Sequence, residues 1–460
     1  MAEIVLPSKP LAVNPLKASQ PIGASLAFLG LADAMPLEHG ARGCAAFNKL
    51  FFMRHFREPI ALQTTAMEQT ATILGADGNV VEALATICSK NAPSVIGLIT
   101  TGLSESQGAD IPPTIKAFRA AFPQHRDVAI IPVSATDTLG NLETGFATAL
   151  EAIIAALIPS APSPARSPRT VNVLTSAMLT PGDIDAIKDW IGAFGLTPIV
   201  LPDIADSLDG HMIEAGFSTL TYGGTSRGGI ANMGASIATL SVGRSVGRAA
   251  DLLKSRTGIP DYRFPSLMSL ADCDSFTAAL AEISGSEVPA GLKRKRAQLE
   301  DAMVDCQFQL GGARIAVAAD PDLLAAIVGF LTSLGAEVVA AVASARADHL
   351  SQLPIDSVVI GDLEDFEWLA REQGAELIIA NSHGAGIAAR LGTAFLRAGF
   401  PIYDSYGAHA LSWSGYAGMR RTLFGIANLL AAHYQEIAPY RSRYWQGTPR
   451  EFETVRDVSC

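Results

Sequence analysis

The feature that most constrains the fold is a series of short, continuously apolar runs that alternate with helical patterns along the 460 residues. Eight such runs are residues 94–100, 128–133, 171–175, 198–201, 314–318, 338–342, 357–360 and 377–380. Strands that are apolar throughout, without the alternation of a half-exposed sheet, are typical of parallel sheets covered by helices on both faces. The sequence therefore predicts an α/β fold with doubly wound parallel sheets.

The length of the chain indicates several units of this kind, because single hydrophobic cores stop growing at roughly 250–300 residues. Residues 159–168 carry four prolines in ten positions and are predicted to be a linker. A softer boundary lies in the polar, helix-like stretch 291–309, after which a new strand–helix series begins. We expect three Rossmann-like domains at 1–168, 169–310 and 311–460, the last ending in C-terminal helices.

Charge and hydropathy exclude two classes of partner. The net charge is −11, and the one basic cluster, Lys293 to Arg296, is predicted to be a solvated helix face, so no nucleic acid is expected. No stretch approaches the ~20 apolar residues of a membrane span, and residues 1–17 lack the apolar segment of a signal peptide. These observations favour a cytoplasmic protein that binds no membrane.

The segment from Pro36 to Pro59 holds the most informative cysteine. Gly40 and Gly43 form a tight turn, and a helical pattern begins at Cys44. A thiol in the first turn of a helix lies at the positive end of the macrodipole, which favours the thiolate that binds iron. The alternative is that Cys44 is a small buried hydrophobic residue, and the residues alone leave both interpretations open.

The other cysteines do not predict a metal site. Cys88 lies in a helical pattern, Cys273 in a loop-like stretch, Cys306 in the connecting helix, and Cys460 ends the chain. The five cysteines contain no Cys-x-x-Cys pair, which argues against a disulfide framework and against a site built from closely spaced ligands. A [4Fe–4S] cluster needs about four thiolates, so any such cluster would take most of its ligands from elsewhere.

Three blocks in fixed order, residues 14–24, 39–44 and 54–59, resemble the nitrogenase molybdenum–iron protein β-chain and its cofactor-assembly relatives. In that β-chain three cysteines hold the large P-cluster. At the matching positions this chain has Ser19, Cys44 and Gly102, so one thiolate of three remains. This pattern is similar to the NifN branch of the family, in which a smaller [4Fe–4S] cluster takes three cysteines from a NifE-type chain and one from the NifN side.

The resemblance implies a nitrogenase-like fold, a role in nitrogen fixation and a scaffold without independent catalytic activity. It makes Cys44 the single cluster ligand of this chain, with His39 and Arg42 as candidate donors of hydrogen bonds to the cluster sulfides, while His55 is expected to be structural. It also implies a NifE-type partner, a heterotetramer of two such pairs, a precursor of the iron–molybdenum cofactor held mainly by the partner, and docking of the nitrogenase iron protein. A catalytic nitrogenase β-chain is the alternative, but Ser19 and Gly102 oppose it.

Two glycine-rich segments predict other chemistry. Residues 223–229 could cradle an anion but lack the ending of a P-loop, and a mobile surface loop is predicted there. Gly384-Ala-Gly386-Ile-Ala-Ala389, with Asp404 20 residues after Gly384, is similar to a dinucleotide fingerprint and would suit an NAD-dependent dehydrogenase. The motif comes late in the chain, and the same glycines can serve a helix that begins tightly on a sheet.

Overall fold

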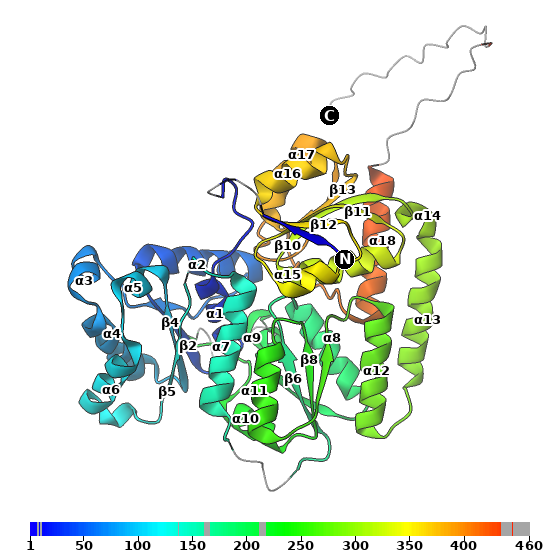
Figure 1. The fold of residues 1–460 in the computed structure, drawn as a ribbon. Helices are drawn as coiled ribbons and strands as arrows, with labels where there is room; N and C mark the ends of the chain where they lie inside the picture. Colours follow the sequence, from blue (N-terminus) through cyan, green and yellow to red (C-terminus); the bar gives the residue numbers. More distant parts are fainter. Residues whose placement is uncertain are drawn as a thin grey trace, which may run out of the picture.

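The computed structural model describes residues 1–433 and Tyr444, apart from residues 7–8, 10–11, 137, 161–165 and 211–217. Half of the predicted linker 159–168, and Cys460, therefore lie outside the described residues. The described chain forms three sheets in which every strand pair is parallel, with helices packed on their faces (Figure 1). The predicted α/β class with doubly wound parallel sheets is confirmed.

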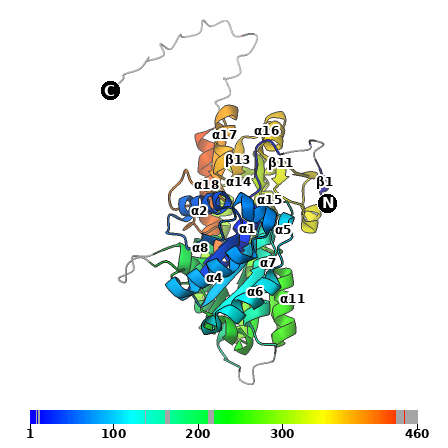
Figure 2. The same cartoon turned by 90° about the vertical axis from the view of Figure 1, so that its left-hand side faces the viewer.

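The first unit is built on the sheet β3-β2-β4-β5. Its strands are β2 (Ala34–His39), β3 (Gln63–Thr64), β4 (Val95–Thr100) and β5 (Ala129–Val133). Its helices are α1 (Gln20–Leu29), α2 (Arg42–Phe56), α3 (Gln69–Leu74), α4 (Asp77–Asn91), α5 (Gly102–Gln107), α6 (Ile111–Ala121) and α7 (Leu142–Leu157). Helices α4 and α6 cover the outer face of the sheet (Figure 2), while α1 and α7 pack together on the inner face.

The second unit is built on the sheet β7-β6-β8-β9. Its strands are β6 (Thr170–Thr175), β7 (Thr197–Leu201), β8 (Ala238–Val242) and β9 (Asp261–Phe264). Its helices are α8 (Pro181–Gly192), α9 (Ile204–Leu208), α10 (Arg227–Asn232), α11 (Gly247–Thr257) and α12 (Leu270–Ser284). Helices α13 (Ala290–Asp305) and α14 (Gln307–Leu310) lead from this unit to the third, in the stretch that the sequence predicted to be a connecting helix.

The third unit is built on the sheet β1-β12-β11-β10-β13-β14. Its strands are β1 (Glu3–Val5), β10 (Arg314–Ala319), β11 (Glu337–Ala343), β12 (Ser357–Ile360), β13 (Leu377–Ala380) and β14 (Ala394–Arg397). Its helices are α15 (Pro321–Ser333), α16 (Leu363–Glu372), α17 (Ala385–Leu391) and α18 (Gly415–Ala432). The N-terminal strand β1 thus lies in the last sheet, where Glu3 is opposite Ser357, and α18 returns to pack on α13.

A buried polar junction joins the three units. Glu143, on α7, accepts a hydrogen bond from the Asp322 N–H at 2.8 Å, and the Asp322 carboxylate accepts one from the Ser245 N–H at 2.9 Å. Asn141 Nδ2 donates to the Asp320 carboxylate at 2.9 Å. Burial, together with the carboxylates of Asp322 and Asp320, raises the pKa of Glu143 well above its usual value. Residues from all three units therefore share one hydrogen-bonded cluster, which fixes the units against one another.

Two sequence predictions differ from the structure. Residues 223–229 are only partly the surface loop that was predicted: residues 226–228 are exposed, but Thr225 is buried, its N–H donates to the Gly30 carbonyl at 2.9 Å, and α10 begins at Arg227. The Asp206 carboxylate already accepts from the Gly224 N–H at 2.8 Å, so Gly224 binds an anion of the chain itself. Cys273 was placed in a loop, but it lies in the first turn of α12, because Ser269 caps that helix by accepting from the Asp272 N–H.

Among the described helices, none combines the length and the apolarity that crossing a bilayer requires.

Candidate cluster-binding edge

Cys44 lies at the beginning of α2, on the surface of the first unit. The helix starts at Arg42, so Cys44 is its third residue, and the thiol is exposed. Ala41 precedes the helix and has no side-chain oxygen with which to cap it. The predicted helix start near the cysteine is confirmed, but α2 begins two residues earlier than expected, so Gly43 lies inside the helix and not in a turn. The alternative of a small hydrophobic residue in a dry core is excluded by the exposure of Cys44.

The other two positions at which the family β-chain has cysteines lie close to α2. The turn before Cys44 packs on the residue before Gly102, because the Thr101 hydroxyl donates to the His39 carbonyl at 2.9 Å and a Cβ on Gly40 would lie 2.7 Å from that hydroxyl. Ser19, the N-cap residue of α1, lines the same surface groove as Phe51 of α2. The structure therefore gathers the three positions around one helix, and one of them carries a thiol.

His39 and Arg42, the candidate hydrogen-bond donors, differ in their access to the surface. Arg42 is exposed, and its guanidinium lies 3.6 Å from the Glu68 carboxylate. His39 is fully buried at the end of β2, where its Nδ1 lies 2.9 Å from the Thr65 hydroxyl and burial lowers its pKa. Its Nε2 has no hydrogen-bond partner among the described residues.

An apolar stripe continues along α2 from Cys44, and the sequence analysis did not identify it. The stripe consists of Phe47, Leu50 and Met53, which are 64%, 46% and 45% exposed. Each step of three residues turns about 60° around the helix axis, so these side chains form a surface that winds around α2, with Phe47 at the end nearest Cys44. The spacing is visible in the sequence, but only the structure shows that the other face of α2 is the buried one. Exposed apolar patches of this kind mark interaction surfaces.

The described residues can offer a cubane cluster one thiolate. No group of three His, Cys, Asp or Glu side chains within the described ranges could hold a metal ion. Cys88, Cys273 and Cys306 are buried, and burial raises the pKa of each thiol, which opposes the thiolate. A [4Fe–4S] cluster that takes about four thiolates fits this edge only if a second chain supplies the others.

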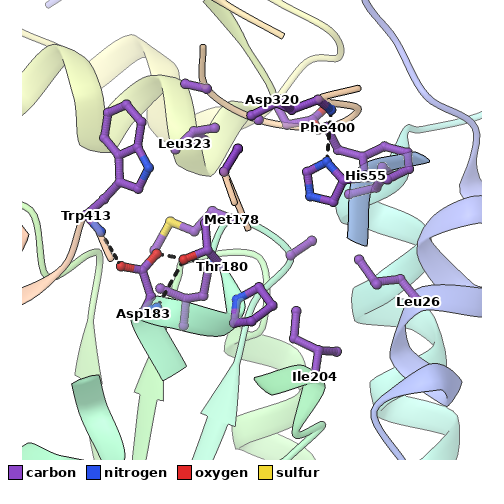
Figure 3. A pocket seen from close by; sticks show the side chains of 18 of the residues that line it. Leu26, His55, Met178, Thr180, Asp183, Ile204, Asp320, Leu323, Phe400 and Trp413 are labelled. Atoms are coloured by element: carbon purple, nitrogen blue, oxygen red, sulfur yellow. Dashed lines mark hydrogen bonds between the residues drawn. The ribbon is translucent and has the colours of Figure 1, made fainter. Parts of the chain in front are cut away.

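A small cavity where the three units meet does not offer room for a larger cofactor (Figure 3). Its volume is about 60 Å³, and its wall is mostly apolar, with Leu26, Leu323 and Phe400 among its residues. Ligand pockets usually enclose ~300–1,000 Å³, so this space suits at most a few water molecules.

The dinucleotide-like motif serves local packing. A Cβ on Gly384 would lie 2.7 Å from the Cβ of Ala380, so the glycine lets α17 begin close against β13. The Asp404 carboxylate is paired with Arg397 at 2.8 Å and accepts from the Ser382 hydroxyl, and these contacts lower its pKa. Asp404 is therefore occupied by the chain itself, which does not support a ribose-binding role or a dehydrogenase.

Comparison with known proteins agrees with this geometry. The family model for nitrogenase component 1 type oxidoreductases matches residues 19–431. The nitrogenase iron-molybdenum cofactor biosynthesis protein NifN of Klebsiella pneumoniae is 46% identical to this chain, over 99% of this chain and 98% of that protein. The protein of the same name from a Nostoc species is also 46% identical, over 93% of this chain and 95% of its own length.

A solved structure shares the whole architecture. A chain of the structure titled "Nitrogenase Cp1 at pH 6.5" superposes with a TM-score of 0.86 and 30% identity, over 93% of this chain and 95% of that chain. The three parallel sheets are thus those of a nitrogenase component, and the sequence similarity extends to NifN proteins over nearly their full length. The chain belongs to the family of nitrogenase component 1 type oxidoreductases, as a relative of its NifN proteins.

Proposed function

We propose that this chain is the NifN-type half of a scaffold for assembling the iron–molybdenum cofactor, and that Cys44 gives one thiolate to a [4Fe–4S] cluster shared with a NifE-type partner. The observation that carries the proposal is an exposed thiol at the start of α2, on an edge where the described residues supply no further cluster ligands. When bound, such a cluster supplies electron transfer at the boundary of the two chains.

The apolar stripe supports a protein partner at the same edge. Phe47 lies three residues after Cys44 and neighbours it on the helix surface, so a chain that covered Phe47 would also reach the thiol. Burying the stripe would exclude water from the cluster, and the partner would bring the remaining thiolates. Arg42, exposed in the first turn beside Glu68, would donate a hydrogen bond to a cluster sulfide.

Further parts of the proposal rest on the relatives. Two such pairs would form a heterotetramer, to which the nitrogenase iron protein docks, in the cytoplasm. A cofactor precursor would be held mainly by the partner. Ser19 and Gly102 in place of thiols oppose the alternative of a catalytic β-chain, because an eight-iron cluster needs more thiolates than Cys44 provides.

The test is the iron content of the two-chain complex with Cys44→Ala. We expect the complex to assemble and to lose most of the iron and acid-labile sulfide of the shared cluster, with a matching loss of its visible absorption. Cys306→Ala removes a buried thiol elsewhere and should leave iron and absorption unchanged. Iron, sulfide, absorption and redox behaviour that all stay the same in Cys44→Ala would reject Cys44 as a ligand.

A further inference from the structure

The C-terminal end of α2 is held by a loop of the third unit. His55 Nδ1 accepts a hydrogen bond from the Ile402 N–H at 2.8 Å (Figure 3), and Arg57 Nη2 donates to the Tyr403 carbonyl at 2.9 Å. The guanidinium carbons of Arg54 and Arg57 lie 4.3 and 4.5 Å from the ring centroids of Tyr403 and Tyr406. We call these contacts between residues 54–57 and the loop 400–406 the clasp.

His55 is the buried centre of the clasp. Its ring lies 5.0 Å from that of Phe400 and 4.5 Å from that of Phe56, centroid to centroid. Burial, with a smaller contribution from His409, lowers the pKa of His55 to about 3, so the imidazole is neutral at physiological pH. Because Nδ1 accepts from Ile402, the neutral ring carries its proton on Nε2. A neutral, buried acceptor gives a fixed contact that ordinary changes of pH do not break.

The loop in the clasp is itself fixed to the third sheet. The Ser382 hydroxyl, after β13, accepts from the Tyr403 N–H at 2.9 Å, and Asn381 Nδ2 donates to the Phe400 carbonyl at 3.0 Å. Asp404 is paired with Arg397, at the end of β14. The end of α2 is therefore attached to the ends of two strands of the third unit.

The middle of α2 is attached to the first unit instead. Asn48 Nδ2 donates to both carboxylate oxygens of Glu38, on β2, at 2.8 and 3.0 Å, and all of these groups are buried. Cys44 lies one turn before Asn48, and His55 lies two turns after it. At ~1.5 Å of rise per residue, Cys44 and His55 are about 16 Å apart along one helix. The helix thus has a contact to the first sheet near its middle, a contact to the third unit at one end, and the thiol at the other.

We propose that His55 is a positioning residue for the Cys44 thiolate: through the clasp, the orientation of the third unit sets where α2 presents its thiol at the shared edge. This inference rests on the proposed function, in which Cys44 binds the cluster. It assigns a role to His55, which the sequence analysis treated as structural, and it makes the cluster sensitive to movements of the loop 400–406. Helices transmit such movements because packed elements shift as rigid bodies.

The test compares two substitutions of His55 in the full two-chain complex. His55→Asn keeps an acceptor near the position of Nδ1, whereas His55→Leu removes it. We expect His55→Leu to shift the midpoint potential and the electron paramagnetic resonance signal of the shared cluster, and His55→Asn to restore both. His125→Leu changes a histidine that is remote from α2 and should have no effect. Unchanged cluster properties in a folded His55→Leu complex, or equal changes in the Asn and Leu variants, would overturn the proposal.

A second measurement separates this proposal from the first. In the separately purified chain, the alkylation rate of Cys44 should change by about 2- to 30-fold in His55→Leu, the range expected for a residue that couples two sites. This rate needs no cluster, so it tests the positioning role even if Cys44→Ala keeps its iron. Should His55→Leu fail to fold, Arg57→Gln removes a contact at the rim of the clasp. It should produce a smaller shift of the same kind, and the absence of any shift would reject the clasp.

Discussion

Two cysteines of this chain lie in the first turn of a helix and have opposite surroundings. Cys44 is exposed at the start of α2, whereas Cys273, in the first turn of α12, is fully buried. The Cys273 sulfur lies 3.4 Å from the Leu267 carbonyl oxygen and 3.7 Å from the Met419 sulfur. Burial, with the nearby charges of Asp272 and Asp274, raises the pKa of the Cys273 thiol. The comparison teaches that a helix start provides a metal ligand only where water or a partner can reach it.

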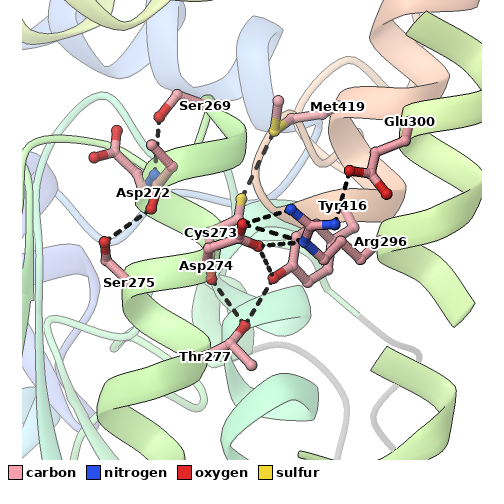
Figure 4. A network of polar contacts seen from close by, with 11 residues as sticks. Ser269, Asp272, Cys273, Asp274, Ser275, Thr277, Arg296, Glu300, Tyr416 and Met419 are labelled. Carbon is pink, nitrogen blue, oxygen red and sulfur yellow. Dashed lines mark hydrogen bonds and ion pairs between the residues drawn. The ribbon is translucent and has the colours of Figure 1, made fainter. Parts of the chain in front are cut away.

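The surroundings of Cys273 are closed by a polar network that joins three helices (Figure 4). Asp274 on α12 accepts two hydrogen bonds from Arg296 Nε and Nη2 on α13, each at 2.9 Å. The Tyr416 hydroxyl on α18 donates to Asp274 at 2.7 Å and lies 3.0 Å from the Thr277 hydroxyl. At Cys44 the corresponding surface is the exposed apolar stripe. One helix start is closed by the chain itself, and the other is exposed.

The largest effect that separates the two sites should be the rate of thiol alkylation in the native, separately purified chain. Cys44 reacts from its exposed position, whereas Cys273 reacts only after the fold opens. Opening of a core that is stable by ~5 kcal/mol or more slows the reaction about 10³-fold or more. The measurement is alkylation with iodoacetamide followed by mass spectrometry of the cysteine-containing peptides.

The same experiment contains its control. After unfolding in urea, the two cysteines should react at similar rates, because the difference lies in the fold. Binding of the partner should then protect Cys44 without changing the reaction of Cys273. Similar alkylation rates for both cysteines in the native chain would show that the two thiols are equally accessible, which contradicts the comparison.

Much of the site around Cys44 could be predicted from the sequence, because it depends on residues that are close together in the chain. Gly40 and Gly43 indicated a turn and then a helix from Cys44, whereas α2 begins two residues earlier, at Arg42, and contains Gly43. The apolar runs also predicted the eight strands β4 to β7 and β10 to β13, because a continuous apolar run is a local signal. The exposure of Cys44 and the apolar stripe could not be predicted, since they depend on which face of α2 the other elements cover.

The features that the sequence missed depend on distant contacts or on mixed signals. Strand β2 contains Pro36, Glu38 and His39, so its sequence is not a continuous apolar run and was not predicted to be a strand. In the structure all of its residues are buried. Strand β1 is recognisable only through its pairing with β12 in the last sheet. Asp272 and Asp274 made the Cys273 segment resemble a loop. In the structure, one follows an N-cap serine and the other binds Arg296.

A second, smaller effect is expected when the polar network around Cys273 is weakened, because the fold around that thiol then opens more often. Asp274→Ala removes the acceptor of Arg296 and of the Tyr416 hydroxyl. Hydrogen bonds to charged groups contribute ~1.5–3 kcal/mol, and the Asp274 and Arg296 side chains are each 38% exposed, which weakens their pairing. We expect the free energy of unfolding to fall by about 2 kcal/mol in total, measured by urea denaturation.

The alkylation of Cys273 should rise in the same variant, by roughly 30-fold for a loss of ~2 kcal/mol. Cys44 should react as before, because α2 has no part in the network. Asp301→Ala is the matched control, since it removes an exposed carboxylate from α13 itself. A rise in the reactivity of Cys44 that equals the rise at Cys273 would mean that the two regions open together, and the comparison would lose its basis.

The smallest effect concerns what each sulfur contributes to stability. Cys273→Ala leaves a small void in a closed core and should cost ~1 kcal/mol. Cys44→Ala removes an exposed atom and places the best helix former in the first turn of α2, so the free energy of unfolding of the separate chain should change by no more than ~0.5 kcal/mol. Urea denaturation of the two variants measures both values. A cost at Cys44 as large as that at Cys273 would show that the Cys44 sulfur stabilises the fold. If Cys44→Ala leaves the free energy of unfolding nearly unchanged but removes iron from the complex, the sulfur serves the cluster and not the fold.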